Sequence, residues 1–100
     1  MSTKLQRFEL GRWQKFPGSA TVLIENSARI VCGAIEGNML CIYAVIVEGM
    51  TKMMRSFYIH ETGGTLNDTE IAYVISYQTP DGKIFHIFDC GYPPPPPPTN

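Results

Sequence analysis

The chain lacks the long apolar segments and the charge imbalance that would assign it to a membrane or to nucleic acid. None of its apolar runs approaches the ~20 residues needed to cross a bilayer, and no secretory apolar region follows Met1. Eight Lys and Arg stand against nine Asp and Glu, giving a net charge of -1. The basic footprint of a protein that binds duplex DNA or RNA is therefore missing. We expect a cytoplasmic protein with neither a membrane nor a duplex partner.

Cysteine and histidine are scarce and widely spaced. Cys32, Cys41 and Cys90 are odd in number and form no Cys-x-x-Cys pair, which argues against a disulfide framework and a metal clamp. We expect Cys32 and Cys41 to be small core residues, because free cysteine is often buried. His60 and His86 belong to no His-x-Glu or His-Glu-x-x-His motif. With no recognisable nucleophile–base pair either, we predict a binding protein that is not an enzyme and has no cofactor or metal.

The centre of the predicted fold is the unbroken apolar run from Met39 to Val47. Its β-branched and aromatic residues favour a strand over a helix, and neither alternating face of that strand is polar. In so small a chain, one face can be covered by the chain's own core. The other face needs a second sheet or a second subunit, which predicts a homo-oligomer.

Apolar runs separated by turn residues predict further strands, and no window sustains a helical period. Two turn signals, Glu36-Gly37-Asn38 and Thr79-Pro80-Asp81-Gly82, predict hairpins. The expected class is all-β and mainly antiparallel, as a small single-domain sandwich or open barrel of about six or seven strands. The predicted strands are residues 5–10, 20–24, 29–35, 39–47, 53–60, 70–78 and 83–89.

The division of the chain follows from its proline content. Residues 1–91 are expected to form a single β-domain, and residues 92–100 a polyproline tail. Six consecutive prolines, Pro93–Pro98, have no backbone N–H groups and favour an extended polyproline II conformation. The tail is either a ligand for an aromatic-lined groove of the SH3 type or a stiff exposed extension.

Two segments are candidates for ligand contact. Residues 2–16 carry half of the chain's positive charge together with aromatic side chains, which is typical of a cationic arm that stacks on bases or of an edge strand guarded by Lys and Arg. Residues 61–69 include Gly63 and Gly64, whose backbone amides could converge on an anion. The same loop lacks the Gly-Lys-Ser pattern of a P-loop, so it is alternatively a simple connection.

Four segments, in this order, resemble a known family: 38–47, 55–64 (Arg-Ser-Phe-Tyr-Ile-His-Glu-Thr-Gly-Gly), 73–77 (Tyr-Val-Ile-Ser-Tyr) and 84–89 (Ile-Phe-His-Ile-Phe-Asp). The family comprises short proteins encoded mainly by tailed bacteriophages and is described only as a domain of unknown function. The resemblance spans residues 20–89 and departs at Gly64, where the family often has histidine. It implies a phage protein that acts in the cytoplasm of the infected bacterial host, where such proteins often block a defence factor or sequester its nucleotide signal.

The leading hypothesis is therefore an oligomeric phage-type binding protein that neutralises a host factor, in its sharper form an anti-defence protein that sequesters a nucleotide immune signal at subunit interfaces. The alternatives are a protein-binding inhibitor and a virion or assembly component, acting through the apolar sheet face or the proline tail. In the nucleotide form, Arg12 and Arg55 would contact phosphate, and the 62–65 loop would supply backbone amides. The candidate ligand-binding residues are Arg12, Trp13, Arg55, Tyr58, His60, Thr62, Gly63, Gly64 and Thr65, with Trp13, Tyr58 or His60 stacking on a base.

Overall fold

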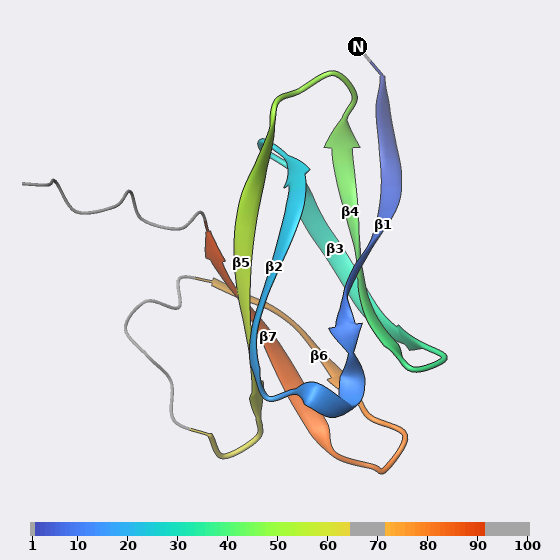
Figure 1. Ribbon diagram of the computed structural model, residues 1–100, viewed down its shortest axis with the longest axis vertical. Coiled ribbons are helices and arrows are strands. Elements are labelled where there is room, and N and C mark those ends of the chain that lie inside the picture. The colour runs from blue at the N-terminus through green and yellow to red at the C-terminus, as the bar shows by residue number, and fades with distance from the viewer. Residues whose placement is uncertain (1, 65–71, 92–100) are drawn as a thin grey trace, which may run out of the picture.

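The computed structural model describes residues 2–64 and 72–91, and these residues form two facing antiparallel β-sheets (Figure 1). One sheet has three strands in the order β1-β4-β3, and the other has four in the order β2-β5-β7-β6. The sheets do not close into a barrel, and the predicted all-β, mainly antiparallel class with about seven strands is confirmed. The elements are β1 (Thr3–Arg12), a 3-10 turn η1 (Trp13–Lys15), β2 (Gly18–Glu25), β3 (Arg29–Glu36), β4 (Met39–Val47), β5 (Lys52–Glu61), β6 (Ala72–Gln78) and β7 (Ile84–Gly91).

β4 is the middle strand of the three-stranded sheet, paired with β1 on one side and with β3 on the other. Its inward side chains, Leu40, Ile42, Ala44 and Ile46, are buried in the core between the sheets. The outward side chains Tyr43 and Val45 are only half-buried in the single chain. The apolar run is thus the centre of its sheet as predicted, and its outer face is only partly covered.

The predicted hairpins are both present. β3 and β4 pair across the 37–38 turn, and β6 and β7 pair across the 79–83 turn. In the second turn the Thr79 amide donates to the Lys83 carbonyl over 2.8 Å, and the Thr79 hydroxyl donates to the Asp81 carboxylate. That side-chain hydrogen bond is the main reason why the pKa of Asp81 lies below its ordinary value.

Two β-bulges alter the faces predicted from strict alternation. A register shift between Ile30 and Cys32 leaves Cys32 exposed, so its prediction as a core residue is wrong, whereas Cys41 is buried as expected. A second shift between Tyr73 and Ile75 places Tyr73 and Tyr77 on opposite faces of β6, although alternation predicts one shared face. A bulge adds one residue to a strand and so reverses the side-chain order beyond it.

No helix within residues 2–64 and 72–91 is long and apolar enough to cross a membrane. The predicted proline tail, residues 92–100, lies outside the described part of the chain, as does the start of the strand predicted at 70–78.

The core contains a tyrosine whose hydroxyl makes no hydrogen bond within the described residues. Tyr77 is 8% exposed, and its hydroxyl has no partner among the described residues. Burial raises the pKa of Tyr77 well above its ordinary value, because the phenolate would have to be desolvated.

We expect Tyr77→Phe to raise the free energy of unfolding at pH 7 by about 1 kcal/mol, since it removes an unsatisfied buried hydroxyl. Because the unfolded chain ionises this phenol above about pH 10 and the folded chain does not, the wild type loses stability as pH rises, which the variant does not share. Its advantage should grow by up to about 1 kcal/mol between pH 10 and 11. Urea unfolding of both proteins at pH 7, 10 and 11 measures this difference, and equal pH slopes would contradict the assignment.

Candidate functional site

A continuous row of aromatic rings runs across β5, β7 and β6 on the outer face of the four-stranded sheet. Tyr58 stands opposite Phe88 across β5 and β7, and Tyr73 stands opposite Phe88 across β7 and β6. The ring centroids of Tyr58 and His60 are 4.5 Å apart, those of His60 and Phe88 5.6 Å, and those of Tyr73 and Phe88 5.4 Å. We call Tyr58, His60, Tyr73, His86 and Phe88 the aromatic face. Rings at these distances stabilise one another and offer flat apolar surface to a ligand.

The turn that follows β5 packs against this face. Gly63 has a positive φ of 93°, which closes the turn, and a Cβ on Gly64 would lie 3.5 Å from His60 Nδ1. The turn therefore approaches the imidazole closely, and His60 is buried although it points away from the core. Thr62 and the two glycines form one wall over the aromatic face.

Both ring nitrogens of His86 are held by neighbouring side chains. Its Nε2 lies 2.8 Å from the Thr62 hydroxyl, and its Nδ1 lies 3.2 Å from the Tyr73 hydroxyl. The Thr62 hydroxyl also donates to the Ile84 carbonyl over 3.2 Å. In this arrangement the Thr62 hydroxyl accepts from His86 Nε2, and His86 Nδ1 accepts from the Tyr73 hydroxyl. This network fixes the orientation of His86 and of one edge of the aromatic face.

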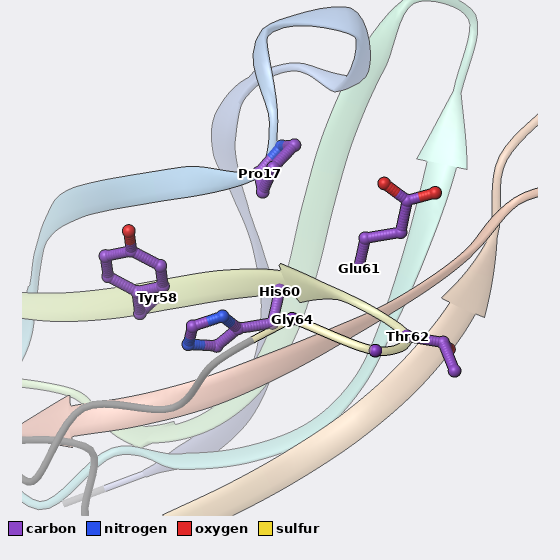
Figure 2. A pocket seen from close by; sticks show the side chains of 7 residues that line it. Pro17, Tyr58, His60, Glu61, Thr62 and Gly64 are labelled. Atoms are coloured by element: carbon purple, nitrogen blue, oxygen red, sulfur yellow. The ribbon is translucent and has the colours of Figure 1, made fainter.

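Two cavities open on the two sides of this turn. The larger has a volume of about 530 Å³ and is bounded by Pro17 and Tyr58, with His60 and the turn (Figure 2). The smaller, about 250 Å³, is bounded by the remaining aromatic face and the same turn. Figure 2 shows the Tyr58 and His60 rings side by side along β5. The Glu61 side chain, at the end of the strand, points away from the His60 ring. Volumes of this order accommodate the ring system of a small ligand.

The cavities have no cationic side chain among their described lining residues, since neither Lys nor Arg is present there. The Thr62 hydroxyl is engaged with Ile84 and His86, and the Glu61 carboxylate points away from His60 (Figure 2). The Thr62 amide donates to the Ile84 carbonyl, and the Gly64 amide donates to the Glu61 carbonyl. Of the four backbone amides of residues 62–65 expected to meet an anion, those of Thr62 and Gly64 are thus used within the chain, and Thr65 lies outside the described residues. The site is better suited to an aromatic ring than to a phosphate group.

The structure brings together five of the sequence-predicted residues: Tyr58, His60, Thr62, Gly63 and Gly64. Arg55 lies elsewhere, between the sheets, where its guanidinium forms an ion pair with Asp89 and its Nη1 donates to the Ala28 carbonyl over 2.6 Å. Arg12 is exposed at the end of β1, and Trp13 lines a different groove. Thr65 lies outside the described residues.

Sequence reasoning missed part of this site. Tyr73, His86 and Phe88 come from the last two strands and meet Tyr58 and His60 only through sheet pairing, and Pro17 comes from the bend that precedes β2. The shared face of His86 and Phe88 was visible from their spacing of two residues. The bulge beside Tyr73 hid its place on that face.

Within residues 2–64 and 72–91, no three His, Cys, Asp or Glu side chains are grouped closely enough to hold a metal ion. Comparison with known proteins gives one family: the model of a domain of unknown function (DUF7352) matches residues 1–95. No curated protein and no solved structure matches the chain.

Proposed function

Because the chain belongs to the family described as a domain of unknown function (DUF7352), whose description assigns no activity, we propose from the geometry that this is a binding protein whose aromatic face holds the base of a nucleotide ligand. The observation that carries the proposal is the row of five rings beside two cavities. Stacking of a base on an aromatic side chain contributes about 1–3 kcal/mol and needs no particular base edge. The Thr62 hydroxyl, held by Ile84 and His86, lies at the rim of both cavities.

The phosphates of such a ligand require cations from beyond the described lining of the cavities. Arg55 is engaged with Asp89 in the interior, whereas Arg12 is exposed on the other sheet. We propose that the positive charge comes from a neighbouring copy, so that the ligand is held at a subunit interface. In the setting that the family resemblance implies, the protein is a phage anti-defence protein in the bacterial cytoplasm, and it sequesters a nucleotide immune signal without turnover.

The test is a thermal-shift and calorimetric panel of the four nucleosides, their cyclic monophosphates and cyclic dinucleotides. A ligand at about 100 times its Kd stabilises the native state by about 2.7 kcal/mol, which raises the Tm by several degrees. Chromatography of the recovered ligand should return it chemically unchanged. A flat panel would remove the nucleotide proposal, and conversion of the ligand would show an enzyme.

We expect Tyr58→Ala to weaken binding of the active compound about tenfold, because one stacking surface is lost. The matched control is Tyr43→Ala, which removes a tyrosine of similar half-burial from the outer face of the opposite sheet. Calorimetric Kd values should rise for the first variant and stay unchanged for the second. An equal effect of both substitutions would place the ligand elsewhere.

The alternative, a protein-binding inhibitor, rests on the outer face of the three-stranded sheet. Leu5 is 61% exposed there and stands opposite the half-buried Val45, with Tyr43 two residues before Val45 along β4. An exposed apolar patch of this kind is a common protein interface. It becomes the leading function if no nucleotide raises the Tm and if Leu5→Lys abolishes binding of a purified host protein that the wild type retains.

A further inference from the structure

A second groove with aromatic walls lies apart from the aromatic face. It runs between η1 and the 79–83 turn, which Figure 1 shows at the same end of the molecule, and its volume is about 220 Å³. It is lined by Trp13, Gln14, Phe16, Asp81, Lys83 and Phe85. No part of the proposed nucleotide site uses these residues.

The chemistry of the groove matches a polyproline segment. Phe16 and Phe85 are 5% and 3% exposed and form an apolar floor, while Trp13 is half-buried and forms a wall. A run of prolines has carbonyl acceptors and no N–H donors, so a partner must supply both flat apolar surface and donors. The indole of Trp13, the amide of Gln14 and the ammonium of Lys83 are all donors.

We propose that this groove binds the Pro93–Pro98 segment of a second copy of the chain. Two copies that exchange these segments form a closed dimer, in which each groove is occupied by its partner's prolines. Aromatic-lined grooves that recognise extended prolines are a recurring mode of peptide binding, because the polyproline II conformation is preformed and loses little entropy.

The length of the chain argues for a second copy over the chain's own segment. Gly91 ends β7 away from the groove, and Phe85 precedes it by six residues, about 20 Å along the strand. Pro98 follows Gly91 by seven residues, about 22 Å in polyproline II conformation. A segment folded back along its own chain would bring only its last proline level with the groove. A partner's segment has the same reach but starts from a point set by how the two copies dock, so its whole proline run can lie level with the groove.

The experiment uses the full chain and its single tryptophan, Trp13, as a reporter. The wild type should have the mass of a dimer by light scattering at 50–100 µM (roughly a hundred times a micromolar Kd), and on dilution its tryptophan emission should shift to longer wavelength. A full-length variant with all six prolines replaced by serine should be monomeric, with the long-wavelength emission and an unchanged far-ultraviolet circular dichroism spectrum. Adding the peptide Tyr-Pro-Pro-Pro-Pro-Pro-Pro-Thr-Asn to this variant should restore the short-wavelength emission saturably.

A rim variant tests the groove itself. Gln14→Ala with Lys83→Ala removes two donors and should raise the dimer Kd about tenfold, while Lys52→Ala, an exposed lysine at the start of β5, should leave it unchanged. A monomeric wild type would overturn the proposal, even if its Trp13 is shielded by the chain's own prolines. A serine variant with unchanged mass and emission would overturn it too.

Discussion

Arg55→Met is expected to lower the free energy of unfolding by about 3 kcal/mol, because it leaves the Asp89 carboxylate without its cation. The side chains of Arg55 and Asp89 are only 15% and 13% exposed, and Arg55 Nε lies 3.1 Å from Asp89 Oδ2. The Ala28 carbonyl also loses its donor. Urea unfolding at pH 7 measures the loss, which corresponds to a fall in Tm of more than about 10 °C.

A second substitution separates the unpaired charge from the lost packing. Asp89 also accepts a hydrogen bond from the Gly91 amide over 2.8 Å, and asparagine preserves that acceptor. Arg55→Met with Asp89→Asn removes both charges and should recover at least half of the loss. A double variant as unstable as Arg55→Met alone would show that packing, and not the unpaired carboxylate, dominates.

The same double variant tests the phosphate-binding role that the sequence predicted for Arg55. Because the guanidinium lies between the sheets and engages Asp89 and Ala28, the folded double variant should bind any active nucleotide with a Kd within about threefold of the wild type. A Kd raised tenfold or more would show that Arg55 contributes to ligand binding after all.

Gly33→Val is expected to destabilise the protein by about 3 kcal/mol through overpacking. A Cβ on Gly33 would lie 2.5 Å from Ile75 Cδ1 and 3.2 Å from the Cys41 carbonyl oxygen. The absence of a side chain at Gly33 is what allows β6 of one sheet to pack against β3 of the other. Thermal unfolding should show a fall in Tm of more than about 10 °C.

The contact can be isolated with a double-mutant cycle. Gly33→Ala introduces only the Cβ, and Ile75→Val deletes the Cδ1 atom that this Cβ would meet. Each single variant should be less stable than the wild type, and the double variant should be more stable than the sum of the two losses by about 1 kcal/mol. Strict additivity would mean that Ile75 rotates away without cost and that the Cys41 carbonyl sets the limit.

Much of the fold follows from local pattern. The run from Met39 to Val47 is a strand with the predicted bounds, and the turns at 37–38 and 79–83 join the predicted hairpins. These predictions succeed because a covered strand and a tight turn are specified by neighbouring residues. The burial of Cys41 follows in the same way, whereas the exposure of Cys32 does not.

The candidate site was only partly visible in the sequence. Tyr58, His60 and Thr62 are close together along the chain, so one strand and its turn suffice to group them. Tyr73 and His86 join them through pairing between β5, β7 and β6, over separations that no local pattern encodes. Arg55 was wrongly included in the predicted site. Alternation places it on the same side of β5 as Phe57, but no local pattern shows that Asp89 lies there and forms an ion pair with it.

The sequence by itself determined the all-β class, the central strand from Met39 to Val47 and the two hairpins, because side-chain alternation and turn chemistry act over a few residues. Only the tertiary structure decided which strands share a sheet and where bulges reverse a face. It also decided that Arg55 pairs with Asp89 between the sheets, while five aromatic rings lie together on the outer face. The physical reason is that strand pairing joins residues far apart in the chain, and one inserted residue moves every later side chain to the opposite face.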